Sequence, residues 1–332
     1  MTRSPKVVVV GTGSFGKNHV RVLNELGALA GVIDINQTAA KAFADLYKVP
    51  WSSNLKDFDF DVVDGAVIST PTTTHFDVAN QLIAKGVEYL FIEKPVVTDV
   101  TEALELAQIM EQRDAKLMAG FIERFNQAVT QVRSYLLDGR IGDPIIMAAS
   151  RIRQWPDRPI DLGVIKDAAI HDIDIVRYLS EEMPSSAYAL AGSLTGRPME
   201  DHATIVLNFR RHRAVLEANW ITPSKSRRLA VTGTTGYIEA DLVTQEVTVK
   251  DDKGSFTKAV VWKEPLLFEL RSFLEAISNG STPSPGREDA IANLVLAEAA
   301  LASSQLNRAV SLNEIFDRYK GHQLDNYLRR QN

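Results

Sequence analysis

Val-Val-Val-Val at residues 7–10 runs directly into Gly-Thr-Gly-Ser-Phe-Gly at residues 11–16, and this stretch decides the fold of the first part of the chain. The valines predict a buried strand, and apolar residues at helical spacing follow the glycines. In this context Gly11 suits a tight turn, Gly13 lets a pyrophosphate approach the backbone, and Gly16 lets the helix pack closely on the strand. Because a helix amino terminus favours an anion, the stretch predicts a dinucleotide site, with an ordinary strand–helix turn as the alternative.

Short β-branched runs alternate with helix-period segments over the first 120 residues. This alternation predicts a doubly wound parallel sheet, because parallel strands need crossovers that bury their apolar stripe on the sheet. Gly27 and Gly86 are placed as helix stops. The predicted strands are Lys6–Val10, Ala30–Asp34, Val63–Ser69, Tyr89–Ile92 and Lys116–Gly120, and the predicted helices are Lys17–Leu26, Gln37–Tyr47, Phe76–Lys85 and Thr101–Arg113.

After about residue 122 the strands become half-exposed and are joined by short turns, such as Gly233–Gly236. Such strands predict a large, mostly antiparallel sheet with helices on one face. We therefore expect an α/β NAD-binding Rossmann domain over residues 1–122 and an α+β domain over residues 123–332, to which the family resemblance described below assigns substrate binding and oligomerisation. The predicted strands are Ile145–Arg153, Ala203–Phe209, Ala214–Trp220, Arg227–Thr232, Tyr237–Asp241 and Glu246–Lys250, and the predicted helices are Gln127–Leu137, Ile170–Leu179, Leu266–Ser278 and Asp289–Leu306.

Composition excludes several classes of protein. The 332 residues include 37 Lys+Arg against 42 Asp+Glu, a net charge of −5, and no cysteine. Without cysteine there is no disulfide scaffold, no cysteine-bound zinc or iron–sulfur site and no cysteine nucleophile. A mildly acidic chain is also a poor binder of the nucleic-acid backbone. No apolar run approaches the ~20 residues that span a bilayer, so we expect a cytoplasmic protein with no membrane or nucleic-acid partner.

Asp34 ends the second predicted strand. Its carboxylate can accept hydrogen bonds from adenosine ribose hydroxyls and would repel a 2′-phosphate. Because positions 35–40 contain no arginine or lysine, the sequence favours NAD over NADP. The alternative is that Asp34 only ends a strand.

Two polar segments follow later strands at their carboxyl ends, where open parallel sheets bind ligands. Thr70-Pro-Thr-Thr-Thr-His75 follows one strand and Glu93-Lys94-Pro95 follows the next. These positions place Lys94 at the edge of the predicted crevice. A surface lysine before a turn fits the same pattern.

A third segment, Asp-Ala-Ala-Ile-His-Asp-Ile-Asp at residues 167–174, lies in the predicted second domain. On a helix, Asp167, His171 and Asp174 share one face. A neighbouring carboxylate holds one imidazole nitrogen as a donor and makes the other a better proton acceptor, as a general base requires. A structural cluster at a helix end is the alternative. We expect no metal, because one histidine with carboxylates is a thin ligand set.

Taken together, G-x-G-x-x-G, T-P-x-x-x-H, E-K-P and D-x-x-x-H resemble the glucose–fructose oxidoreductase / inositol dehydrogenase / MocA family of NAD(P)-dependent sugar oxidoreductases over essentially the whole chain. The resemblance implies that Lys94 lies beside the substrate hydroxyl, that His171 accepts its proton and that Asp167 orients the site. It also implies a homodimer or homotetramer formed through the second sheet. The cofactor contacts expected for NAD are Gly11, Thr12, Gly13, Ser14, Phe15, Gly16, Asp34, Ser69, Thr70, Pro71, Thr72, His75, Glu93 and Lys94.

Three runs, at residues 120–126, 151–158 and 161–174, are similar to UDP-N-acetylglucosamine 3-dehydrogenases and related uronate enzymes. Gln127 departs from this pattern, because many relatives have proline there. Arginine side chains could offer planar donor forks to a diphosphate, although salt bridges on a solvated sheet face are the alternative. The expected substrate contacts are Lys94, Arg124, Asn126, Arg151, Arg153, Arg158, Asp167 and His171.

The sequence therefore predicts NAD-dependent oxidation of a sugar ring hydroxyl. The expected substrate is UDP-N-acetylglucosamine or its uronate, oxidised at the 3-hydroxyl to the 3-keto nucleotide sugar. An inositol, polyol or free-sugar dehydrogenase is the alternative, and a non-catalytic NAD-binding sensor is a third reading.

Overall fold

A computed structural model describes residues 4–157, 160–258, 261–319 and 324–328. The chain forms two compact units, each with its own sheet. The first contains Met1–Phe121 and Leu266–Ile291, and the second contains Ile122–Pro265 and Ala292–Asn332. The sequence analysis assigns the whole of 123–332 to one domain, whereas Leu266–Ile291 packs with the N-terminal residues.

The first unit contains a six-stranded sheet in which every pairing is parallel, with strand order β3-β2-β1-β4-β5-β6. This order confirms the predicted doubly wound sheet. Helices cover both faces, so β1 is an unbroken apolar run whose first three valines are fully buried. The short strand β3 was not predicted. The strands are β1 (Val7–Val10), β2 (Leu29–Ile33), β3 (Trp51–Ser52), β4 (Gly65–Ile68), β5 (Tyr89–Glu93) and β6 (Lys116–Gly120).

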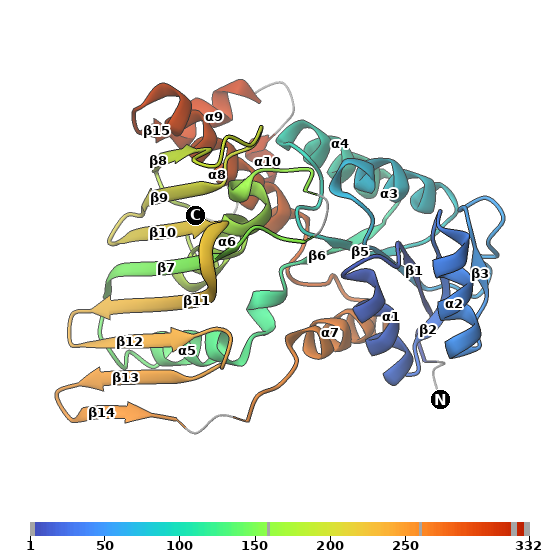
Figure 1. The fold of residues 1–332 in the computed structure, drawn as a ribbon, viewed down its shortest axis with the longest axis horizontal. Coiled ribbons are helices and arrows are strands. Elements are labelled where there is room, and N and C mark those ends of the chain that lie inside the picture. Colours follow the sequence, from blue (N-terminus) through green and yellow to red (C-terminus); the bar gives the residue numbers. More distant parts are fainter. Residues whose placement is uncertain (1–3, 158–159, 259–260, 320–323, 329–332) are drawn as a thin grey trace. The chain divides into compact units, whose positions relative to one another are not determined.

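Helices of the first unit lie on both faces of this sheet (Figure 1). α3 and α4 contact each other on one face. On the other face α1 and α7 meet β5 through a chain of ring contacts, in which Phe91 touches both His19 and Phe273. The helices are α1 (Gly16–Glu25), α2 (Gln37–Tyr47), α3 (His75–Ala84), α4 (Val100–Gln112) and α7 (Pro265–Asn279).

The second unit contains a nine-stranded sheet of order β14-β13-β12-β11-β7-β10-β9-β8-β15. All its pairings are antiparallel except that of β10 with β7, which confirms the predicted mostly antiparallel sheet. Its strands are β7 (Pro144–Gln154), β8 (Ser186–Gly192), β9 (His202–Asn208), β10 (Arg213–Asn219), β11 (Ile221–Gly233), β12 (Gly236–Asp241), β13 (Val247–Asp251), β14 (Gly254–Thr257) and β15 (Val310–Ser311).

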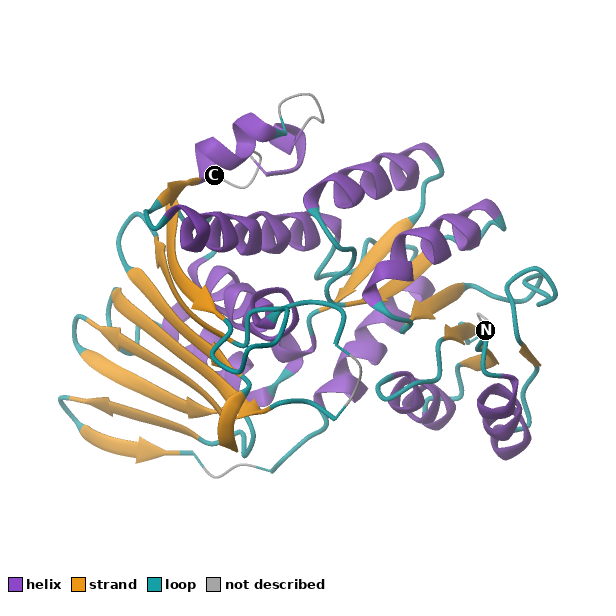
Figure 2. Cartoon of the chain, turned by 45° about the horizontal axis from the view of Figure 1, so that its top comes forward, coloured by secondary structure: helices purple, strands orange, loops and turns teal. Residues whose placement is uncertain are grey.

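Helices cover one face of the nine-stranded sheet (Figure 2). α5 contacts β12 and β13, and α6 contacts β7 and β10. On the opposite face the strand registers align Tyr188, Val206, Val215, Ala148 and Ala230 in one row across five strands. The helices are α5 (Gln127–Leu137), α6 (Ile170–Ser180), α8 (Arg287–Leu306), α9 (Leu312–Arg318) and α10 (Leu324–Leu328).

Candidate functional site

In the glycine-rich turn between β1 and α1, two of the three glycines have no room for a side chain, whereas the third has. A Cβ on Gly11, whose φ is +88°, would lie 2.6 Å from the carbonyl oxygen of Ser69, and a Cβ on Gly16 would lie 1.9 Å from that of Gly11. A Cβ on Gly13 would meet nothing within 4 Å in the described part of the chain. Helix α1 begins at Gly16 with no side-chain cap, and the N–H groups of Lys17 and Asn18 donate to the carbonyl oxygens of Gly13 and Phe15. These features fit the pyrophosphate of NAD.

Asp34, directly after β2, holds this turn in place. Its Oδ2 accepts hydrogen bonds from the backbone N–H of Thr12 at 2.6 Å and from the Thr12 hydroxyl at 2.7 Å. Its Oδ1 accepts from the N–H of Asn36 at 2.8 Å. Asp34 therefore orients the turn. It also lies at the position where the sequence predicts a contact with the adenosine ribose.

His75 joins the segments that follow β4 and β5. Its Nε2 lies 2.9 Å from the carbonyl oxygen of Thr70, and its Nδ1 lies 3.0 Å from that of Pro95. Burial lowers the pKa of His75, although the carbonyl contacts oppose this shift. The imidazole is fully buried and holds the two segments together.

The predicted cofactor residues of the first unit gather at one edge of its sheet, because β1, β4 and β5 are adjacent and parallel. Ser69 and Thr70 follow β4, Glu93 ends β5, and Lys94 comes next. Pro71 is exposed and Thr72 is buried. Lys94 itself is half-buried. Their contacts with a cofactor stay predictions.

His171 and Asp167 of the second unit do not lie on one regular α-helix. Asp167 is in a π-helical turn, Ile165–Ala169, and His171 is in the first turn of α6. A π-turn shifts the spacing of side chains and occurs often at functional sites. Both side chains are half-buried. Asp174, which the sequence places on the same helix face as His171, is fully buried and has a different interaction.

That interaction is a buried ion pair with Arg124. The guanidinium donates from Nε to Oδ2 of Asp174 at 2.8 Å and from Nη2 to Oδ1 at 2.6 Å, and Asn293 donates to Oδ1 at 2.7 Å. The guanidinium also lies 4.8 Å from the ring centre of Tyr178. Asn126 is buried too, capping α5 and donating to the carbonyl oxygen of Leu242. Arg124 and Asn126 thus make internal contacts.

Arg151 on β7 is the centre of a second buried ion network. It donates from Nε and Nη2 to Asp172 at 3.0 and 2.9 Å, and from Nη1 to Glu123 at 2.9 Å. Arg227 on β11 donates to the same Glu123 at 3.0 Å. Burial opposes ionisation of Glu123, but the two arginines outweigh it and hold its pKa below the ordinary value. Asp172 follows His171 directly in the first turn of α6.

Two further cations lie next to this network. Arg153 is half-buried and donates to the carbonyl oxygen of Gln154. Lys225 is exposed, and Arg227 first, then burial and Arg153, lower its pKa. Neither has a carboxylate partner within the described ranges. We call Arg151, Arg153, Lys225 and Arg227 the cation cluster.

The cation cluster carries an excess of positive charge. By formal charge, its four cations face two carboxylates, Glu123 and Asp172, which leaves 4 − 2 = +2, and burial raises the pKa of Asp172. The sequence analysis missed Lys225 and Arg227. Their spacing of two residues, which puts both on one face of a strand, was the available signal. Arg158 lies outside the described residues.

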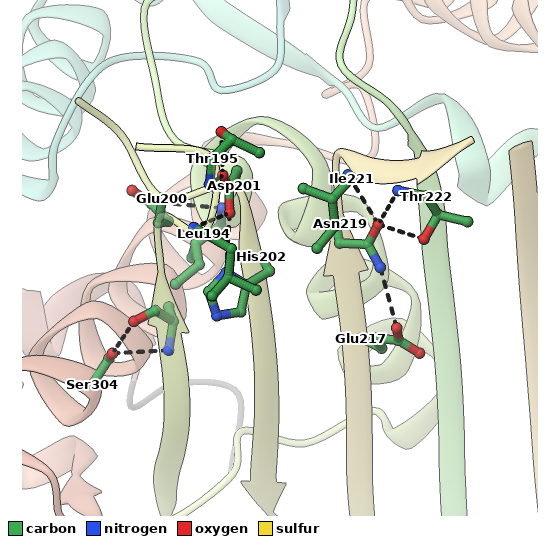
Figure 3. Close-up of polar contacts among 12 residues, drawn as sticks. Leu194, Thr195, Glu200, Asp201, His202, Glu217, Asn219, Ile221, Thr222 and Ser304 are labelled. Carbon is green, nitrogen blue, oxygen red and sulfur yellow. Dashed lines mark hydrogen bonds and ion pairs between the residues drawn. The ribbon is translucent and has the colours of Figure 1, made fainter. Parts of the chain in front are cut away.

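The start of β11, which carries Lys225 and Arg227, is fixed by Asn219 (Figure 3). Asn219 Oδ1 accepts hydrogen bonds from the N–H groups of Ile221 and Thr222 and from the Thr222 hydroxyl. The neighbouring loop is held by Asp201, which accepts from the N–H groups of Leu194 and Thr195. These hydrogen bonds, with those from the Thr195 hydroxyl and His202, keep the pKa of Asp201 well below its usual range although burial opposes them.

Two general properties hold for the residues with described positions. Among them, no helix is both long and apolar enough to cross a membrane. The same residues include no group of three or more His, Asp or Glu side chains arranged to hold a metal ion.

The fold and its residues define an NAD-dependent dehydrogenase. Residues 5–121 match the oxidoreductase family model with an NAD-binding Rossmann fold, and residues 129–239 match the GFO/IDH/MocA C-terminal domain. The chain belongs to the GFO/IDH/MocA family.

Two kinds of relative are equally similar. An inositol 2-dehydrogenase of Rhizobium meliloti is 28% identical over 92% of this chain and 98% of its own. A UDP-N-acetylglucosamine 3-dehydrogenase of Acidithiobacillus ferrooxidans is 30% identical over 81% of this chain and 88% of its own. A crystal structure of the latter enzyme superposes with a TM-score of 0.83 at 25% identity, covering 91% of this chain and 98% of its own. The protein is thus a dehydrogenase of sugar or polyol hydroxyls.

Proposed function

We propose that the protein oxidises a ring hydroxyl of a nucleotide sugar, namely the 3-hydroxyl of UDP-N-acetylglucosamine or its uronate. The observation that carries this proposal is the +2 excess of the cation cluster. A diphosphate compensates positive charge through charge-assisted hydrogen bonds, whereas a neutral polyol does not. Sequence identity alone favours neither substrate, since relatives of both kinds are similar to this chain.

The basic side chains of the candidate site divide into two roles in this proposal. Arg124 and Arg151 are buried and paired with carboxylates, so they support the fold of the second unit. Arg153, Lys225 and Arg227 supply the charge for the diphosphate. Asp172 connects Arg151 to the first turn of α6, which carries His171.

His171 removes the hydroxyl proton in the proposed reaction, and Asp167 orients the site. NAD bound at the glycine-rich turn would supply the hydride acceptor for the carbon that bears this hydroxyl. The alcohol becomes a ketone as its O–H and C–H bonds break. An alcohol proton does not leave unaided near pH 7, so the ammonium of Lys94 stabilises the developing alkoxide. Lys94→Ala and His171→Ala should each abolish turnover with NAD affinity nearly unchanged, and loss of NAD affinity would contradict these roles.

The substrate is tested by NADH formation with a panel of UDP-sugars and with myo-inositol. Lys225→Ala should raise the KM for the UDP-sugar about 10-fold, as expected for loss of a charged hydrogen bond, with kcat retained. Lys250→Ala, an exposed lysine on β13, is the matched control and should change neither. Turnover of myo-inositol alone, unaffected by Lys225→Ala, would identify a polyol dehydrogenase. If no substrate yields NADH, the result would favour a non-catalytic NAD-binding sensor.

We also propose that the chain self-associates through the row of Tyr188, Val206, Val215, Ala148 and Ala230. The row lies on the face opposite α5 and α6, and Tyr188 and Val215 are each 38% exposed. Such apolar contacts typically form the centre of a subunit interface. Val215→Asp should therefore reduce the mass measured by light scattering to that of one 36.7 kDa chain. An unchanged mass would exclude this surface.

A further inference from the structure

His19 and Glu93 form a buried pair within the first unit that the proposed reaction does not use. The Nε2 of His19 lies 2.7 Å from Oε1 of Glu93, and the exposed fractions of the two side chains are 0% and 12%. The residues are 74 positions apart, one on α1 and the other at the end of β5. A carboxylate withdrawn from water in this way is costly unless each oxygen has a donor.

The second oxygen of Glu93 accepts from the backbone of the next residue. The N–H of Lys94 lies 3.2 Å from Oε2. The neighbouring strand leaves the carboxylate little room, because a Cβ on Gly120 would lie 3.1 Å from Oε2. Glu93 is thus held by α1, by β6 and by the peptide that carries Lys94.

The hydrogen-bonding pattern fixes the tautomer of His19. Its Nδ1 is buried and has no hydrogen-bond partner among the residues whose positions are described. The rings of Phe15 and Phe91 pack edge-on against the imidazole at 5.4 and 5.1 Å. A proton on Nδ1 would be an unsatisfied donor between apolar rings, so the ring proton belongs on Nε2, where it donates to Glu93.

The same contacts link two functional segments. Phe15 belongs to the glycine-rich turn, and Lys94 is the group assigned to the alkoxide. An ammonium that stabilises a transition state must be held to within a fraction of an ångström. We infer that His19 and Glu93 are positioning residues, which hold the backbone of Lys94 in register with the glycine-rich turn. This inference rests on the role proposed for Lys94, but not on the identity of the sugar.

The inference is tested with Glu93→Gln, His19→Gln and the double variant. Glu102→Gln is the matched control, because Glu102 also accepts from a backbone N–H and a hydroxyl, those of Thr98, at 2.9 and 2.7 Å. At saturating NAD, Glu93→Gln should lower kcat 10- to 100-fold, as expected for a misplaced catalytic group. The double variant should be no slower than Glu93→Gln, since the two residues act as one unit.

The deciding measurement is the isotope effect with substrate deuterated at the oxidised carbon. A misplaced Lys94 slows the chemical step, so the effect on kcat should rise in Glu93→Gln and stay at the wild-type value in Glu102→Gln. Unchanged kcat in Glu93→Gln, or a loss of kcat with an unchanged isotope effect, would overturn the inference. The assay uses whichever of the UDP-sugar and myo-inositol yields NADH. The inference about His19 and Glu93 is therefore tested even if the nucleotide-sugar proposal fails.

Discussion

Replacing Arg124 with methionine separates a structural role for this arginine from a role in substrate binding. Methionine keeps an unbranched stem but removes both hydrogen bonds to Asp174, at 2.8 and 2.6 Å. Asp174 is fully buried and, among the described residues, would keep only the side-chain hydrogen bond from Asn293. Breaking a buried ion pair by removing one partner costs about 3–5 kcal/mol.

That loss corresponds to a large shift in melting temperature. For a domain of 150–250 residues, 1 kcal/mol lowers Tm by about 2–4 °C, so Arg124→Met should lower the Tm of the second unit by roughly 6–20 °C. Differential scanning calorimetry measures this shift, and steady-state kinetics measures the KM for the UDP-sugar. Arg153→Met is the comparison variant. Because Arg153 has no carboxylate partner within the described ranges, it should leave Tm within about 2 °C while raising KM.

The opposite pattern would refute this reasoning. If Arg124→Met melts at the wild-type temperature and its KM rises 10-fold, then Arg124 contacts the substrate as the sequence analysis expects, and the pair with Asp174 contributes little to stability.

Three further predictions concern Asp34 and Gly16 at the glycine-rich turn and one buried histidine, His212. Asp34→Ala should weaken NAD binding at least 10-fold in a fluorescence titration, because it loses the predicted ribose contact and the hydrogen bonds that hold Thr12; unchanged affinity would show that Asp34 only ends a strand. Gly16→Ala should abolish NAD binding, since its Cβ would lie 1.9 Å from the carbonyl oxygen of Gly11, and wild-type affinity would disprove the close approach. Burial lowers the pKa of His212, so the unfolded chain takes up its proton first and stability falls as pH drops below about 6.5. His212→Gln should make Tm less steep between pH 7.5 and 5, and an equal slope would exclude this contribution.

Local sequence patterns predicted most elements of the fold, because alternation, helical spacing and glycines act over short distances. Strand β8 was missed, since its alternating alanines give a weak signal. The first half of β11 was missed as well, because Pro223 and polar residues stand where its register with β7 is irregular. The parallel pairing of β10 with β7 has no local signal either, as it depends on which strands become neighbours.

The candidate site was predictable only in part for the same reason. The glycine-rich turn and Asp34 are linked by a known spacing, so their contact could be expected. The partners of Arg124 and Arg151 are 50 and 21 residues away, and nothing near either arginine marks it as buried. The net charge of the sequence does not show which arginines are paired with buried carboxylates and which contribute the excess positive charge of the cation cluster.

The packing of Leu266–Ile291 into the first unit has a consequence for synthesis of the protein. Phe273 on α7 packs against Phe91 on β5, so the N-terminal sheet lacks part of its cover until the chain has grown beyond α7. At 5–20 residues per second, the interval between residue 121 and residue 291 lasts about 10–30 s. During that time the apolar surface beneath α7 is uncovered on the ribosome. The first unit of this chain therefore begins to be translated first but is completed late.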